Sequence, residues 1–522
     1  MYTLTGLLLL FVLLFSSAFT FFTFFRLEER FPDSSLVVSL SGAFLLLMTL
    51  GLLSVVVSPA VTRIAIVLLF IFYLHVMITS RKFRSFLRVV KKDSIAITAW
   101  ILLALFATVF STFNVPSQGN LPDGAYVFKE WNKPVQMQWV SGSLPMDNAL
   151  PYYTAEFLVR DQNVEVDHPI FPGQEIILRT YGLPFSYLAI RSLIDTSHET
   201  LEIPRFRYVE TDWPDVRPLY SDDRYGLFNG VSFGVLSFLM FCIIYIARRL
   251  IGNRFIVHIA ILFTTTPFFL QQTYFTWSKN LALAFALLLF YYRKSQSKFL
   301  TSILIFLGFF SHPMFLIYMV ALLGFGWVIE RKIYGHLALQ YLVFDLAWRL
   351  YVFTTGLESN LIQQNFKLNS DIVNQIASRV VSLANVFNLD YLRGFPFNLT
   401  QFAFGAIGSV ITVSIFSFAI TIISSLNPKK AVIGTKGKKD QAQIENFNFF
   451  IFAFFALLVS AAIYSTPAPL LMFGGQVLSI AVIFQISVRA NRGYEFYLPI
   501  MANLFIIFAW ARVINVEGLQ LL

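Results

Sequence analysis

Charged residues and cysteine are both scarce in this sequence. Asp, Glu, Lys and Arg make up 13% of its 522 residues, whereas about 25% is usual for a soluble domain. The shortage of charge excludes an ordinary soluble fold and indicates an integral membrane protein, in keeping with a mean hydropathy of +0.68. Cys242 is the only cysteine, which excludes an intramolecular disulfide.

Two motifs of soluble enzymes are also missing. The sequence has no Walker-type glycine loop and no set of Cys and His residues at zinc-binding spacing. The net charge of +10 comes from Lys and Arg that cluster in short loops between apolar runs. We therefore interpret the positive charge as a topology signal, and we do not expect nucleic acid as a partner.

Long apolar runs are abundant. A transmembrane helix needs about 20 mostly apolar residues, because lipid offers backbone groups no hydrogen-bond partner. The sequence predicts an all-α polytopic membrane protein with about 12–14 transmembrane helices. The candidate spans are 3–25, 35–57, 61–80, 94–113, 226–247, 255–273, 279–292, 299–311, 314–330, 335–355, 401–425, 447–464, 471–488 and 497–515. A His-Pro dipeptide breaks 299–330 into two short antiparallel helices.

Lys and Arg fall in the short loops that follow alternate spans, namely 81–92, 248–254, 293–298, 331–332 and 426–446. The positive-inside rule places these loops in the cytoplasm. Four regions follow: N-terminal spans (1–93), a catalytic core (94–357) that carries one large external α+β or helical loop domain (114–225), an external amphipathic segment (358–400), and C-terminal spans (401–522) with the Lys-rich cytoplasmic loop 426–446.

Asp123 is the leading candidate for a catalytic base. It lies in the run Leu121 to Lys129, which opens the external segment shortly after the span 94–113. A carboxylate held near the hydrocarbon boundary has a raised proton affinity, which suits it to accept a proton from a hydroxyl group. Tyr126 would lie on the next turn and contact the substrate. The alternative is that Pro122 to Gly124 forms only a turn and a helix cap.

Three further acidic residues are candidates for substrate binding. Asp147 precedes two tyrosines, Tyr152 and Tyr153, and carbohydrate sites often combine carboxylates with aromatic faces. Asp222 and Asp223 lie where the external segment re-enters the membrane, and they could bind an acceptor hydroxyl or a divalent metal. Each has a structural alternative: a capped turn for Asp147 and an interfacial charge cap for the Asp pair.

Four basic residues are candidates for binding a lipid phosphate. Lys279 begins a span on the external side, where a lysine can neutralise a phosphate or simply anchor the span. His312, next to a proline, could donate a hydrogen bond to a phosphate or fill the helix break. Arg393 and Arg492 carry the planar guanidinium group that suits phosphate recognition.

In this order, the features resemble the GT-C superfamily of integral membrane glycosyltransferases, which includes protein mannosyltransferases and the aminoarabinose transferases of lipid A. The resemblance covers about 94–515. It rests on the Asp-x-x-Tyr segment after a span, the long external loop and three later segments: Thr-Trp-Ser-Lys-Asn-Leu-Ala-Leu-Ala-Phe-Ala-Leu-Leu (Thr276 to Leu288), Gly-Phe-Phe-Ser-His-Pro (Gly308 to Pro313) and Tyr-Glu-Phe-Tyr-Leu-Pro (Tyr494 to Pro499).

The resemblance implies a transferase that takes a sugar from a polyprenyl-phosphate donor. The sugar would pass, with inversion, to a glycan, lipid or protein acceptor on the outer face of the cytoplasmic membrane. Asp123 would be the general base, and Lys279, His312 and a late arginine would hold the donor phosphate. No cofactor is required, although a divalent metal could assist. Two features depart from the family pattern. Three additional spans precede the one that leads into the catalytic loop, and the span count places Arg492 on the cytoplasmic side.

Three other functions fit part of the pattern. A lipid or polysaccharide transporter or flippase shares the many spans and intramembrane charges, but inverted repeats in hydropathy are not evident. A polysaccharide polymerase or ligase usually carries its main loop late in the chain, whereas here the loop comes early. A non-catalytic assembly subunit is the third alternative.

Overall fold

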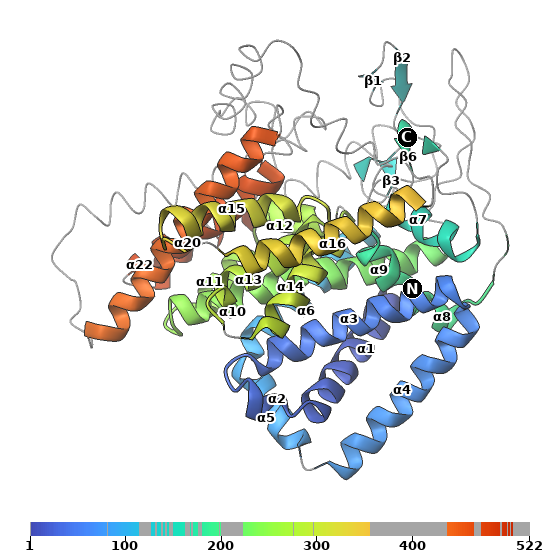
Figure 1. The fold of residues 1–522 in the computed structure, drawn as a ribbon, viewed down its shortest axis with the longest axis horizontal. Coiled ribbons are helices and arrows are strands. Elements are labelled where there is room, and N and C mark those ends of the chain that lie inside the picture. Colours follow the sequence, from blue (N-terminus) through green and yellow to red (C-terminus); the bar gives the residue numbers. More distant parts are fainter. Residues whose placement is uncertain are drawn as a thin grey trace.

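The computed structural model of the protein is built almost entirely of helices (Figure 1). It describes residues 2–80, 82–113, 150–161, 180–197, 199, 223–274, 276–295, 297–332, 334–354, 436–463, 471–490, 493–497, 500–501 and 503–504, together with the strand segments given below.

The helices are α1 (Tyr2–Phe24), α2 (Leu27–Arg30), α3 (Ser35–Val56), α4 (Pro59–Thr79), α5 (Phe83–Lys92), α6 (Ser94–Phe113), α7 (Leu150–Val159), α8 (Gly182–Ile194), α9 (Asp223–Leu236), α10 (Phe238–Leu250), α11 (Ile256–Thr264), α12 (Pro267–Tyr274), α13 (Lys279–Tyr292), α14 (Lys298–Ser311), α15 (Phe315–Val328), α16 (Gly335–Thr354), α20 (Lys436–Ile463), the π-helical turn η5 (Leu471–Gly475), α22 (Gln476–Arg489) and the 3₁₀ turn η6 (Gly493–Phe496).

Three antiparallel strand pairs lie between α6 and α8. They are β1 (Val127–Glu130) with β2 (Lys133–Gln136), β3 (Trp139–Val140) with β4 (Leu144–Pro145), and β5 (Asp167–His168) with β6 (Phe171–Glu175). The large external α+β or helical domain expected over 114–225 is therefore described only as these pairs and the helices α7 and α8, and as a domain it stays a prediction.

The prediction of a membrane-embedded helical protein is confirmed in its coarse form. Within the described residues, five helices are long and apolar enough to cross a membrane: α1, α3, α4, the span Arg224–Leu250 formed by α9 and α10 together, and Ile444–Ile463 of α20. The pair α5 and α6, bent by 76°, passes the same test only when the two helices are taken together. Several other apolar helices, among them α13, α14 and α15, are shorter. The finer figure of 12–14 spans stays a prediction.

Two apolar runs are each broken into two helices at a proline. The predicted break in 299–330 is confirmed, because α14 ends at Ser311 and α15 begins at Phe315. A second break was not predicted: the span 255–273 is divided into α11 and α12, with Pro267 as the first residue of α12. Proline has no N–H to donate within a helix, so it is tolerated at such a start and disfavours helix at the residue before it.

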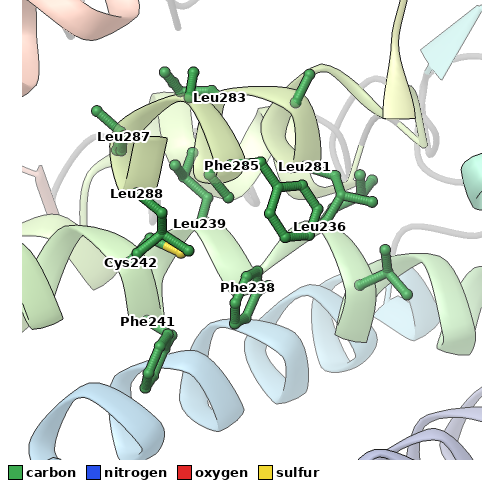
Figure 2. Close-up of a cluster of buried hydrophobic side chains, with 14 of the residues drawn as sticks. Leu236, Phe238, Leu239, Phe241, Cys242, Leu281, Leu283, Phe285, Leu287 and Leu288 are labelled. Carbon is green, nitrogen blue, oxygen red and sulfur yellow. The ribbon is translucent and has the colours of Figure 1, made fainter. Parts of the chain in front are cut away.

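The helix Arg224–Leu250 is the centre of the fold. Every residue of its most apolar window is buried within the protein, as expected for a helix that is apolar all round. In Figure 2, Phe238 and Phe241 point away from α13 and towards α6. There their ring centroids lie 5.1 and 6.0 Å from that of Trp100. Phe285 of α13 meets Phe238 from the other side at 5.8 Å.

A glycine stripe lets α1 approach this central helix closely. Gly226, Gly230 and Gly234 recur every fourth residue, so they share one helix face. A Cβ atom on Gly230 would lie 1.9 Å from the backbone oxygen of Thr3 in α1. The run Gly230 to Gly234 also has the Gly-x-Ser-x-Gly spacing of hydrolase nucleophile turns. Here it lies within a helix and its serine, Ser232, is buried, so the spacing serves helix packing.

The basic loops meet at one end of the helices, which we call the basic end. Asp93 pairs with Arg248 and Arg249, each at 3.2 Å. Arg293 pairs with Glu330 and with Glu445, each at 2.7 Å. The hydroxyls of Tyr245 and Tyr292 share a hydrogen bond that links the two groups, so the loops 81–92, 248–254, 293–298 and 331–332 are gathered at one side of the described helices. Which compartment this side faces stays a prediction.

Glu330 is held ionised by its neighbours at the basic end. Burial by itself would raise the pKa of Glu330. Hydrogen bonds from Arg293, Tyr334 and Lys294 outweigh this effect and lower its pKa from 4.5 to about 2. The pairs with Arg293 and Lys294 join the end of α13 to the end of α15.

The opposite end is marked by three buried serines, Ser192, Ser278 and Ser311, and we call it the serine end. Ser54, at the end of α3, shares a 2.5 Å hydrogen bond with Ser192 of α8. The Nε of Arg63, at the start of α4, donates to the backbone oxygen of Ser192 at 2.9 Å. In Figure 1, α8 and the N-terminus lie at the end of α1 and α3 that is remote from α2 and α5.

Candidate functional site

Two of the predicted phosphate ligands, Lys279 and His312, belong to segments that meet at the serine end. The hydroxyl of Ser278, directly before Lys279, donates a hydrogen bond to the backbone oxygen of Ser311, directly before His312. Both side chains pack near the ring of Phe473 in η5. The Lys279 Nζ is 5.5 Å from the centroid of that ring, and the imidazole centroid of His312 is 5.6 Å from it.

Lys279 lies at a place where positive potential accumulates. It is the first residue of α13, and the N-terminus of a helix carries a partial positive charge and unpaired N–H groups that favour anions. Its side chain is only 5% exposed, and its Nζ stands 4.1 Å from the centroid of the Trp277 ring. A cation over an aromatic face is stabilised without losing its charge. This end of α13 is therefore suited to an anionic group.

His312 owes its position to the break between α14 and α15. It caps the end of α14 in an extended conformation, and its Nδ1 accepts a hydrogen bond from the backbone N–H of Met314 at 3.1 Å. In a neutral imidazole that accepts at Nδ1, the proton is on Nε2. The side chain is 4% exposed. His312 thus carries an N–H group inside the protein, beside the same Phe473 ring as Lys279.

A pair of amide side chains extends this site. The Nε2 of Gln476 donates to the Oδ1 of Asn280 at 3.1 Å, and both side chains are buried. Within the described part of the chain, the remaining atoms of the pair, Asn280 Nδ2 and Gln476 Oε1, have no hydrogen-bond partner. Gln476 directly follows the π-helical turn η5, and such turns occur frequently at functional sites. The pair adds hydrogen-bonding capacity next to Lys279.

A buried ion network at the serine end was missed from the sequence. Glu156 of α7 is fully buried and accepts three hydrogen bonds: from Arg160 Nε at 2.8 Å, from Arg191 Nε at 2.7 Å and from the hydroxyl of Tyr187 at 2.6 Å. Glu156 and Arg160 are four residues apart on one helix, a spacing that the sequence shows. Arg191 is 35 residues away from Glu156, and no sequence pattern joins the two.

Asp195 and Arg224 continue the network towards α9. Arg224 Nε donates to Asp195 at 2.6 Å, and Arg191 lies 3.5 Å from the same carboxylate. Burial by itself would raise the pKa of Asp195. The hydrogen bonds from Ser197, the charge of Arg191 and the hydrogen bond from Arg224 outweigh it, and the pKa falls to about 2. This chain of pairs fixes α7 and α8 against the start of the central helix.

The other predicted site residues are not brought together in the described structure. Asp223 is the first residue of α9, beside Arg224, and its side chain is not described. Outside the described residues lie Asp123, Tyr126, Asp147, Asp222, Arg393 and Arg492. The residue after Arg492, Gly493, packs against His258 near the start of α11, which follows the basic loop 248–254. No group of three or more potential metal ligands occurs among the described residues.

Comparison of the chain with protein-family models, with curated proteins and with solved structures gives no match.

Proposed function

We propose that this protein is a membrane glycosyltransferase that takes a sugar from a polyprenyl-phosphate donor and passes it to a glycan, lipid or protein acceptor. The reaction would take place on the outer face of the cytoplasmic membrane, at the serine end of the fold. One observation supports this proposal most strongly. Lys279 and His312, 33 positions apart in the sequence, are joined through the Ser278–Ser311 hydrogen bond.

The first step of the argument concerns the donor phosphate. A lysine ammonium, the N-terminus of α13 and the Nε2–H of His312 all favour an anion, and all three lie within the protein. Electrostatic interactions are stronger in such a low-dielectric environment than in water. A lipid phosphate bound here would be stabilised as a ligand, and again as the leaving group on which negative charge develops during transfer.

The second step concerns the acceptor. Asp123 follows α6, whose last residue is Phe113, and α6 packs against α12, the helix directly before the Lys279 segment. In the proposal, Asp123 takes the proton of the acceptor hydroxyl while the oxygen of that hydroxyl attacks the anomeric carbon. The bond from that carbon to the phosphate oxygen breaks, and the lipid phosphate leaves with the electron pair. A single displacement inverts the anomeric centre.

The test is a transfer assay with purified protein and labelled polyprenyl-phosphate sugars. We expect Asp123→Asn to lower kcat by about 10²–10⁴-fold, the usual contribution of a general base. We expect Lys279→Gln to weaken the donor interaction by about 10–100-fold, as for a charged hydrogen bond. The control is Lys298→Gln, which removes an exposed lysine at the basic end and should leave both parameters unchanged.

Two results would overturn the proposal. Unchanged turnover in both site variants would remove these residues from the reaction. A protein that transfers no sugar from any donor, but moves the intact lipid across a vesicle bilayer, would instead be a transporter, a class in which broken helices are also common.

A further inference from the structure

Helix α5 lies at the basic end and runs across the direction of the helix that follows it. It is followed at once by α6, an apolar span, and the two helices are bent by 76° relative to each other. If α6 crosses the bilayer, α5 runs close to the plane of its surface. Figure 1 shows α5 beside α2, at the ends of α1 and α3.

One side of α5 is packed into the protein. Phe83 and Phe86 meet the ring of Phe19 in α1 with centroid distances of 5.4 and 5.3 Å. Phe86 also meets Phe22 at 5.3 Å. These contacts fix the rotation of α5 about its own axis, and therefore fix which residues face outwards.

The outward side is cationic. Arg84, Arg88, Lys91 and Lys92 are all exposed, and at 3.6 residues per turn they occupy an arc of about 100°. Leu87, 47% exposed, borders the same side. The helix contains no acidic residue.

The acidic residues near α5 have partners of their own. Glu28 accepts a hydrogen bond from Ser85 of α5, whose hydroxyl in turn accepts one from Arg88 at 3.3 Å. Glu29 pairs with Lys82 at 3.1 Å. Asp93 pairs with two arginines of α10. None of these ion pairs involves the four outward cations, so the outward side of α5 keeps an excess of positive charge.

The adjoining surface is apolar. Helix α4 ends at Thr79, directly before α5, and only 11% of its most apolar window is buried within the protein. Tyr73, near the end of α4, meets the same Phe19 ring as α5 does, at 5.8 Å. A cationic side and an exposed apolar helix thus adjoin at one edge of the fold.

We propose that this surface binds anionic phospholipid. The phosphate group would contact Arg84, Arg88, Lys91 and Lys92, and the acyl chains would lie along α4. Basic amphipathic helices at a membrane surface recognise anionic head groups in this way, and the apolar neighbour favours a lipid over a free phosphate. This proposal does not depend on the proposed function.

The test measures lipid binding to the full-length protein. Purified protein in detergent receives phosphatidylglycerol or phosphatidylcholine at equal concentration, and native mass spectrometry counts the lipid molecules that stay bound. We expect the native protein to retain phosphatidylglycerol preferentially. We expect the combined substitutions Arg84→Gln, Arg88→Gln, Lys91→Gln and Lys92→Gln to weaken that binding by about fivefold per removed charge at low ionic strength.

The control distinguishes lipid binding by the cations of α5 from a general effect of positive charge. Its four substitutions remove four other exposed cations at the basic end: Arg254→Gln, Lys298→Gln, Arg331→Gln and Lys332→Gln. Because both variants lose the same charge, only a specific surface on α5 makes them differ. A charge-preserving variant, Arg84→Lys with Arg88→Lys, should keep the binding and shows that substituted α5 still folds. Equal losses in the two neutralised variants, or equal retention of both lipids by the native protein, would overturn the proposal.

Discussion

The substitution Glu156→Gln tests the buried ion network most directly. Glu156 is completely buried and neutralises two guanidinium groups, those of Arg160 and Arg191, which are themselves buried. Glutamine has nearly the same shape but no charge. The variant therefore leaves Arg160 without its counter-ion, whereas Arg191 keeps a partial one in Asp195 at 3.5 Å.

The expected loss is large because the desolvation of the two arginines is no longer compensated. Removal of one partner from a buried ion pair typically costs about 3–5 kcal/mol, and we expect Glu156→Gln to lower the free energy of unfolding by an amount in this range. The matched control is Glu29→Gln. Glu29 pairs with Lys82 at 3.1 Å, but the two side chains are 61% and 32% exposed, and such pairs contribute about 0–1 kcal/mol.

The assay is equilibrium unfolding of each purified variant in mixed micelles by titration with sodium dodecyl sulfate. A loss for Glu156→Gln no larger than that for Glu29→Gln would refute the reasoning. The double variant Glu156→Met with Arg160→Met gives a second check. It replaces part of the network by apolar side chains, and we expect it to be more stable than Glu156→Gln because one uncompensated buried charge is gone.

Two further predictions concern packing and pH. Gly230→Ala should destabilise the protein by about 1–3 kcal/mol, because the new methyl group overlaps the backbone of Thr3. The control is Gly226→Ala, whose methyl group would have its nearest neighbour at 3.4 Å. Equal losses of stability in the two variants would contradict the prediction. Because the pKa of Glu330 is lowered from 4.5 to about 2, its stabilising effect is present above pH 4.5 and is lost as the pH falls towards 2. Between pH 6 and pH 2.5, the free energy of unfolding should therefore depend less on pH in Glu330→Gln than in the native protein. An unchanged pH dependence would contradict this assignment.

The helical membrane fold was predictable from the sequence because apolar length and proline act locally. The break at His312 and the helix Gly335–Thr354 follow from such local signals, and both appear in the structure. The break before Pro267 was missed, because the apolar run continues through it. The number of spans could not be read from apolar length alone, since several apolar helices in the described residues are shorter than a full crossing.

The candidate site was predictable by residue type but not by arrangement. Lys279 and His312 were selected because a cation and an imidazole next to helix ends suit a phosphate. Their proximity depends on a hydrogen bond between residues 33 positions apart in the sequence, which no local pattern encodes. The same holds for Glu156 and Arg191. The hypotheses for Asp123 and the other carboxylates of the external segment stay predictions.

The lengths of α13, α14 and α15 indicate how deep in the membrane Lys279 and His312 lie. Each of α13, α14 and α15 contains 14 residues, which corresponds to about 21 Å at 1.5 Å per residue, whereas the hydrocarbon core is about 30 Å thick. Arg293 and Glu330 hold α13 and α15 together at the basic end. If that end lies at one membrane surface and the helices run along the membrane normal, their opposite ends, with Lys279 and His312, lie about 9 Å below the other surface. A phosphate attached to a lipid chain reaches that depth more readily than a soluble one, which favours a lipid-linked donor for the proposed reaction.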